Sequence, residues 1–256
     1  MPKIVSLQKN LTTPKMTIEE QIIAYAKGQD SFTVSQLQNE LGDTLNLDRP
    51  RFNWYLSRLA DEKKLIRIAR GTYQTAEGKR IFAPVPSEEA TMLFNQFHEQ
   101  FPEIGKCVYE GPWFFQFMHH VASNQITYIE VEKDIAETVF HQLQDQGKTV
   151  YLRPDKDLIY NYIDLKTPAI FVKNLTSESP LQRISDVQIP TLEKLLVDMY
   201  SDSDFYYLQG SEYYHIMHYA RSRYAINLSR LQRYARRRNA DNKIIPIFEN
   251  CLYDID

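Results

Sequence analysis

The sequence is poor in glycine and cysteine and has no long apolar run. Its 256 residues include 8 glycines and 2 cysteines. Neither the GxGxxG nor the GxxxxGK(S/T) pattern occurs, which argues against a glycine-rich loop that binds nucleotide phosphates. Two cysteines do not make a disulfide framework and suit a reducing compartment. No apolar run could cross a bilayer, and the first ten residues lack a signal peptide's apolar segment. We therefore expect a soluble, cytoplasmic protein with no membrane partner.

Charge is distributed unevenly along the chain. Residues 1–80 carry 13 Lys and Arg against 9 Asp and Glu, residues 81–215 carry 9 against 20, and residues 216–256 carry 8 against 4. The two ends are therefore basic and the middle is acidic. Basic ends predict contact with nucleic acid, whereas the acidic middle would repel it.

Two helix starts stand out near the N-terminus. Thr17 and Thr33 each begin a capping box, in which the threonine side chain and a Glu or Gln three residues later bond to each other's backbone N–H groups. The first helix should reach about Lys27. The second should end at Gly42, since glycine tolerates the positive φ that terminates many helices.

A third helix and a hairpin complete this region. The helix should begin at Asp48, carry proline in its first turn and run to about Glu62. Residues 65–68 then alternate like a half-buried strand, Arg70-Gly71 makes a turn, and residues 72–74 return. Helix, turn, basic helix and hairpin is the order of a winged helix-turn-helix, which places its last helix in the DNA major groove.

The outward-facing residues of this region are of the types that read bases and hold phosphates. Those near the start of the third helix are expected at base edges, and those further along it or on the hairpin at phosphates. The predicted contacts with double-stranded operator DNA are Arg49, Arg51, Asn53, Trp54, Ser57, Arg58, Lys63, Lys64, Arg67, Arg70 and Thr72. A protein-docking module with a solvated basic face is the alternative.

Residues 76–87 combine proline with small polar residues and are predicted to be a linker. We therefore expect two domains, residues 1–80 and residues 81–256. In the second, residues 125–131 and 149–152 read as strands on either side of a helix that Asp134 caps. Strand, helix, strand predicts a parallel pair. Residues 107–109 and 169–172 supply further strands.

The last third of the chain is predicted to be helical, with helices beginning at Thr191, Ser211 and Asn227. The last of these places leucines on one face and arginines on the other. This possible second basic patch consists of Arg230, Arg233, Arg236 and Arg237. It either holds DNA phosphates beside the winged helix or pairs with the acidic middle of the chain. The fold class is thus α+β or α/β, with an N-terminal winged helix-turn-helix and a C-terminal α/β domain that has a small mixed sheet and terminal helices.

Several segments resemble a known family. EKLLVD at residues 193–198 and YARRR at residues 234–238, together with RGTYQ at residues 70–74, are similar to AbiEi-type antitoxins and their bacterial relatives. The resemblance implies an antitoxin of a type IV toxin–antitoxin pair, which represses its own operon through the winged helix. It also implies a partner toxin that resembles a nucleotidyltransferase.

An enzyme with a DNA-binding head, either a metal-dependent nuclease or a nucleotidyl-transfer enzyme, is the rival class. Glu110, Glu130 and Glu132 invite comparison with metal-dependent nucleases, which need acidic residues and a lysine around a divalent ion. Lys133, however, is displaced by one residue, which in a strand puts it on the wrong face. His215 and His218 have no cysteine pair nearby to complete a metal site. We expect no catalysis, no metal and no cofactor.

Overall fold

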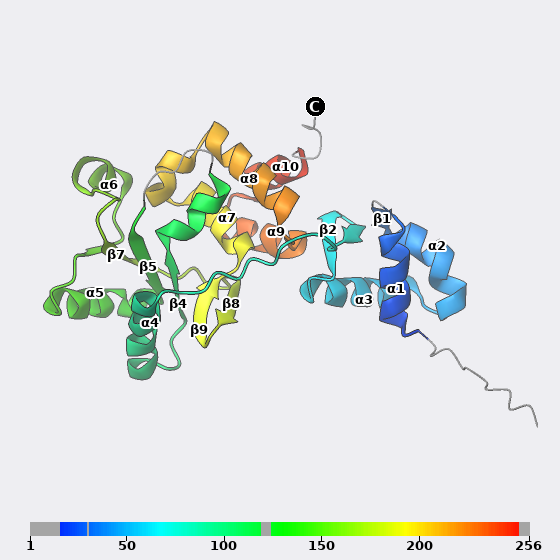
Figure 1. Cartoon of the computed structure of the whole chain (residues 1–256), viewed down its shortest axis with the longest axis horizontal. Helices are drawn as coiled ribbons and strands as arrows, with labels where there is room; N and C mark the ends of the chain where they lie inside the picture. Colours follow the sequence, from blue (N-terminus) through cyan, green and yellow to red (C-terminus); the bar gives the residue numbers. More distant parts are fainter. Residues whose placement is uncertain (1–15, 30, 119–123, 251–256) are drawn as a thin grey trace, which may run out of the picture.

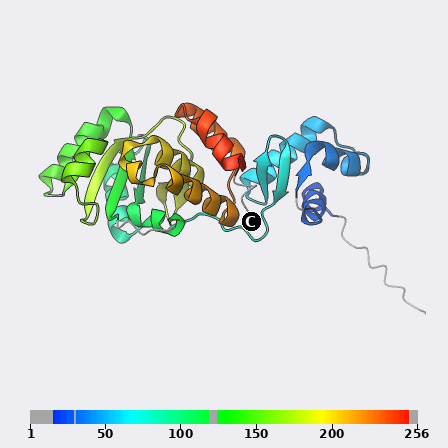
Figure 2. The ribbon, with the colours of Figure 1, turned by 90° about the horizontal axis from the view of Figure 1, so that it is seen from above.

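The structure is a computed structural model and describes residues 16–29, 31–118 and 124–250. It is a mixed α and β protein with a small head at one end and a larger body at the other (Figures 1 and 2). Two separate hydrophobic cores lie on either side of the predicted boundary at residue 80. One comprises residues between Ile22 and Tyr73, and the other residues between Phe82 and Phe248. Within the described residues, no helix is both long enough and apolar enough to span a membrane.

The head contains three helices that begin where the sequence predicts. They are α1 (Ile18–Lys27), α2 (Val34–Leu45) and α3 (Arg49–Asp61). Thr17 and Thr33 form complete capping boxes, and the Asp48 side chain accepts a hydrogen bond from the Arg51 backbone N–H at 3.0 Å. These bonds satisfy backbone donors that the first helical turn leaves unpaired.

The predicted end of α2 at Gly42 is wrong. The helix continues through Gly42 to Leu45, and Asn46 takes the left-handed conformation, with φ of 50°. Its backbone N–H bonds to the Gly42 carbonyl, which closes the last turn. Asparagine is the residue that most readily replaces glycine in this role. The turn to α3 therefore spans only Asn46 to Asp48.

The hairpin of the head is confirmed. Strands β2 (Leu65–Ala69) and β3 (Thr72–Thr75) pair antiparallel, and Gly71 turns between them with φ of 74°. A short strand before α2, β1 (Phe32–Thr33), adds to β3 to give the order β1-β3-β2. Phe32 stacks on Tyr73 with ring centroids 6.1 Å apart, which joins the sheet to the buried faces of the helices.

The sheet of the body has the order β4-β5-β7-β6. Its strands are β4 (Lys106–Glu110), β5 (Ile126–Val131), β6 (Val150–Leu152) and β7 (Ala169–Asn174). β4 runs antiparallel to β5, and the other pairs are parallel. The expected direct pairing of β5 with β6 is wrong, because β7 lies between them. β7 is largely buried and takes a central position, whereas the half-buried β6 forms an edge.

Helices cover both faces of this sheet (Figure 1). α4 (Glu88–Gln100) begins at the predicted Ser87 cap. α5 (Ala136–Asp145) follows a 3-10 turn, η2 (Lys133–Ile135), and no side chain caps it, so the prediction that Asp134 is the cap is wrong. α6 (Lys156–Tyr162) was not predicted, and η1 (Gly111–Phe117) follows β4.

A second hairpin and a group of helices complete the body. β8 (Leu181–Ile184) and β9 (Val187–Pro190) precede α7 (Leu192–Ser201), η3 (Ser203–Leu208), α8 (Ser211–Arg223), α9 (Leu228–Arg237) and α10 (Asp241–Asn250). Thr191 and Asn227 cap α7 and α9 as the sequence predicts. α8 begins at Ser211 as expected, although no side chain caps it. The hairpin and α10 were not predicted.

The predicted linker is irregular, but the body holds it in place. Phe82 is buried in the core of the body. The Lys79 ammonium donates to the carbonyls of Arg221 and Ser222 at 3.0 and 2.6 Å. Arg80 forms a parallel β-bridge with Tyr224. Residues 79–82 therefore connect the head to the body by fixed contacts as well as through the chain, and the division into two domains stays a prediction.

Candidate nucleic-acid interface

α3 has three distinct faces. Phe52, Leu56 and Leu59 are buried in the core of the head. A second face carries the row Arg49, Asn53, Ser57 and Asp61, whose spacing of four residues aligns them along one side of the helix. Trp54 and Arg58, also four apart, form an outer face.

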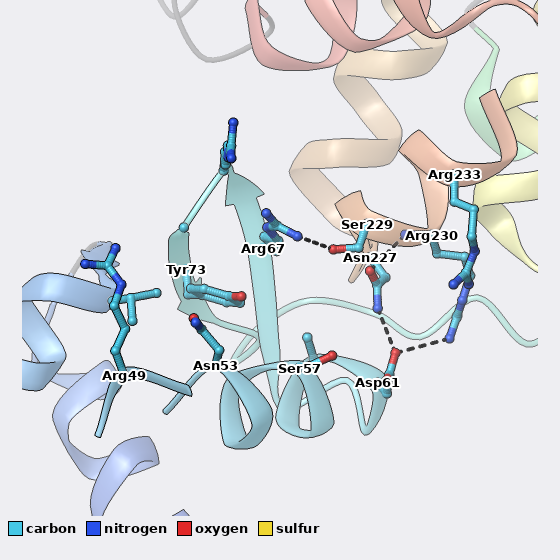
Figure 3. Close-up of a pocket in the computed structure, with 14 residues that line it drawn as sticks. Arg49, Asn53, Ser57, Asp61, Arg67, Tyr73, Asn227, Ser229, Arg230 and Arg233 are labelled. Atoms are coloured by element: carbon cyan, nitrogen blue, oxygen red, sulfur yellow. Dashed lines mark hydrogen bonds and ion pairs between the residues drawn. The ribbon is translucent and has the colours of Figure 1, made fainter. Parts of the chain in front are cut away.

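The row on α3 lines a cleft of about 670 Å³ between the head and the body. The hairpin of the head forms the second wall through Arg67, Arg70 and Tyr73. The third wall comes from the start of α9, more than 150 residues further along the chain (Figure 3). The third wall consists of Asn227, Ser229, Arg230 and Arg233, and the cleft is also lined by Val34, Ala60 and Gly71. The cleft therefore brings residues of both predicted basic patches together.

Of the residues that the structure describes, five arginines and a single carboxylate line this cleft. Arg49, Arg70 and Arg233 are exposed, and none of them makes an ion pair with another described residue. Arg67 donates to the Ser229 hydroxyl at 2.5 Å. Arg230 lies 3.7 Å from a carboxylate oxygen of the one acid, Asp61. The cleft is therefore strongly positive, and arginine binds phosphate through its planar fork of donors.

Other predicted DNA contacts lie away from the cleft. Trp54 is 57% exposed on the outer face, with its ring edge-on to Tyr55, so it does not pack in the core. Arg51 lines a separate hollow beside Asp43 and Asp48. Arg58 lies 5.6 Å from the Trp54 ring.

Two residues that were predicted to bind phosphate, Arg58 and Lys64, form ion pairs with acids of the head. Arg58 pairs with Glu19 and Glu62, each at 2.9 Å, and Lys64 pairs with Glu62 at 2.7 Å. Thr72 is half-buried in β3 and pairs with Thr33 of β1. These three residues serve the fold of the head more directly than they serve the cleft.

Lys63 lies at the junction of head and body. It takes the left-handed conformation, with φ of 58°. Burial lowers the pKa of its ammonium, the nearby Glu193 opposes this, and the neighbouring Arg230 lowers the pKa further. Lys63 therefore faces the body and not open solvent.

The second basic patch divides between three environments. Arg230 and Arg233 line the cleft. Arg236 is exposed and pairs with Asp241 at 3.3 Å, and Arg237 donates to the Ser177 hydroxyl at 2.9 Å. The next residue, Arg238, turns into the body, where it pairs with Asp198 at 2.9 Å and also with Asp202. Among the described contacts, Arg230 is the member of the predicted patch that pairs with a carboxylate of the acidic middle, Glu193 at 3.8 Å.

Arg238 belongs to a network of buried charges between α7, α9 and the sheet. At its centre, the Lys194 ammonium lies 2.7 Å from Glu130 of β5 and 2.5 Å from Asp198. Tyr234 of α9 donates to Asp198 at 2.9 Å. Burial raises the pKa of Asp198 to about 6, against the opposing effect of Lys194, while the carboxylates hold the Lys194 pKa above its usual value.

A second lysine extends this network to the carboxyl end of β7. Lys173 contacts Asp202 at 2.6 Å and Asp204 at 2.9 Å. Burial would raise the Asp202 pKa, but Lys173 and Arg238 lower it to about 2. Glu130, Lys173 and Arg238 also line a smaller hollow of about 360 Å³ at the edge of the sheet.

Two of the three segments that resemble AbiEi-type antitoxins, EKLLVD and YARRR, meet in this network. EKLLVD supplies Lys194 and Asp198, and YARRR supplies Tyr234 and Arg238. These residues join α7 to α9 and so fix the position of α9. They do not themselves line the arginine cleft.

The three glutamates of the nuclease hypothesis do not converge. Glu130 is buried against Lys194, whereas Glu110 lies at the far end of β4, opposite Thr127, and accepts from the Ser87 N–H at 3.0 Å. Glu132 accepts from the Gly105 N–H at 2.8 Å. Within the described parts of the chain, no three or more His, Cys, Asp or Glu residues are grouped to hold a metal ion.

Sequence reasoning missed Asp61, Tyr73, Asn227 and Ser229 as lining residues of the cleft. Asp61 continues the four-residue spacing of Arg49, Asn53 and Ser57. This spacing is a sequence signal that places it beside the predicted contacts. No such local signal exists for Asn227 and Ser229, because only the packing of the body against the head brings them to the cleft.

The chain belongs to a protein family of unknown function, DUF6577, whose model matches residues 51–254. The matched region includes most of α3, the hairpin of the head and all the described elements of the body, and so nearly every wall of the cleft. None of the curated proteins matches this chain significantly.

Proposed function

We propose that this protein is a DNA-binding transcriptional regulator whose head is a winged helix. α2, a three-residue turn and α3 have the order of a helix-turn-helix, and the β2–β3 hairpin is the wing. α3 is the recognition helix. Its row of Arg49, Asn53 and Ser57 faces the same cleft as the wing.

The observation that carries this proposal is the set of three exposed arginines around one cleft that make no ion pair with another described residue, Arg49, Arg70 and Arg233. Leaving like charges close together is unfavourable unless a polyanion binds there. A surface that combines such arginines with an asparagine on a helix matches the chemistry of phosphate and base-edge contacts. A docking site for an acidic protein would explain the positive charge of the cleft, but it would not require an asparagine at position 53.

An antitoxin role is the second part of the proposal and rests on the family resemblance. We propose that the protein represses its own operon and counteracts a nucleotidyltransferase-like toxin through its body. A neighbouring reading frame of that type, toxic alone and harmless when both are expressed, is the expected result. Toxicity that persists with this protein present would contradict the antitoxin role and leave DNA binding untouched.

DNA binding is tested with a labelled duplex from the region upstream of the protein's own gene and a scrambled duplex of equal length. Asn53→Ala should weaken binding to the upstream duplex by about 1–3 kcal/mol and reduce the preference between the two. Arg70→Ala should weaken both equally, because a phosphate contact carries no sequence information. Arg51 does not line the cleft, so Arg51→Ala should weaken DNA binding less than Asn53→Ala or Arg70→Ala does.

The control for these variants is Arg236→Ala, which removes an exposed arginine that does not line the cleft. Titrations at several salt concentrations separate electrostatic from sequence-specific losses. Equal effects of Asn53→Ala on both duplexes would contradict a base-reading role for α3. The absence of salt-dependent binding by the unmodified protein to either duplex would refute the proposed function itself.

A further inference from the structure

We propose that α9 of the body is part of the DNA-binding surface, with Arg230 and Arg233 holding the sugar–phosphate backbone beside the bases that α3 reads. This inference rests on the proposed function and extends it from the head to the whole chain. A winged helix alone would bind through α3 and the wing. Here the cleft has a third wall, and that wall is also basic (Figure 3).

The start of α9 is fixed against α3 by polar contacts. Asn227 caps α9 by accepting from the Arg230 N–H at 3.1 Å, and its side-chain amide donates to Asp61 of α3 at 3.0 Å. The Asn227 backbone N–H donates to the buried Glu193 of α7 at 2.8 Å. Asp61, Asn227 and Glu193 therefore form a continuous bridge from the recognition helix to the body.

The other end of α9 is held by the buried charge network. Tyr234 and Arg238 both bond to Asp198 of α7 at 2.9 Å. A helix fixed at both ends presents its side chains at defined positions. The arginines at its first turns are therefore preorganised toward the cleft, which lowers the entropic cost of binding.

The two arginines of α9 that line the cleft, Arg230 and Arg233, differ in how they are paired. Arg233 is exposed and makes no ion pair with another described residue. Arg230 lies 3.7 Å from Asp61 and 3.8 Å from Glu193, beyond ordinary hydrogen-bond length. The partial positive charge at the start of α9 acts in the same direction as both side chains.

Asp61 has a positioning role in this arrangement. It is the single carboxylate that lines the cleft, and it balances Arg230 while accepting from Asn227. A phosphate that approaches Arg230 is repelled by Asp61. The charge of Asp61 therefore limits sequence-independent binding, and removing that charge should increase it.

The test uses the full-length chain and the two duplexes, upstream and scrambled, titrated from low to physiological salt. Arg233→Ala should weaken binding to both duplexes about 3- to 10-fold at low salt and reduce the salt slope by roughly 0.9. Arg236→Ala is the matched control, because it removes the same charge from the same helix outside the cleft, and should leave the slope unchanged. Asp61→Asn should tighten binding to the scrambled duplex.

The outcomes separate the inference from the function on which it rests. If Arg70→Ala weakens binding while Arg233→Ala behaves like Arg236→Ala, the head binds DNA and α9 takes no part in it. If Arg233→Ala loses the expected affinity and Arg236→Ala does not, α9 is part of the surface. If the unmodified protein binds neither duplex in a salt-dependent way, the proposed function itself is overturned.

Discussion

At the scale of single residues, the position of a charge relative to solvent determines what it does. Lys194 is fully buried between two carboxylates, whereas Arg233 is exposed at a cleft with a single acid. Both are basic residues in helices that the sequence predicts correctly. The first stabilises the contact between α7 and the sheet, and the second makes no ion pair with another described residue.

Lys194→Met should strongly destabilise the body, because it leaves Glu130 and Asp198 buried without their shared cation. Breaking a buried ion pair from one side costs about 3–5 kcal/mol. Urea unfolding followed by circular dichroism measures the loss, with the exposed Lys166→Met as control. A loss below about 1 kcal/mol would mean that the network contributes little to the fold.

At the scale of elements, caps and the conformations that end helices decide boundaries better than composition does. Thr17, Thr33, Ser87 and Thr191 all cap the helices expected of them. Gly42 is of the residue type that often ends a helix, but it lies inside α2. Asn46, four residues later, provides the left-handed residue.

Gly42→Ala should therefore stabilise the head by about 0.5–1 kcal/mol, because alanine is the better residue in a helix interior. A Cβ there would meet Gln38 Cγ at 3.5 Å, an ordinary van der Waals distance. Gly71→Ala is the contrasting control. Its φ of 74° is strained for alanine, so this variant should destabilise. Thermal melts that rank the two variants in the reverse order would show that Gly42 terminates the helix after all.

At the scale of the whole molecule, the head and the body share an interface of mixed character. Ile66 and Ile68 of the hairpin pack against Ala225, and the bridge through Asp61 and Asn227 lies beside them. This apolar contact is small compared with the separate core of the head. We therefore expect the head to fold without the body.

A fragment of residues 1–80 should fold alone, with a helical circular dichroism spectrum and a cooperative melt. It should bind the upstream duplex with a smaller salt slope than the full chain, because it lacks Arg230 and Arg233. An unstructured fragment would show that the head needs the body to fold. An unchanged slope in a folded fragment would argue against a contribution from α9.

The sequence alone determined the local features of this protein. Capping boxes, helical periodicity and the Arg-Gly turn predicted the helices and the hairpin of the head because these signals depend on residues within one or two turns of each other. The same local reasoning placed α4, α7 and α9 and the four strands of the body sheet. It also identified the five arginines that line the cleft.

Only the tertiary structure decided which of these elements meet. The insertion of β7 between β5 and β6, and the contact of Asn227 with Asp61 across 166 positions of sequence, depend on packing between distant segments. Two arginines five residues apart, Arg233 and Arg238, have opposite surroundings. Burial and charge pairing are properties of the folded chain, so no local pattern distinguishes the arginine that lines the cleft from the one that stabilises the body.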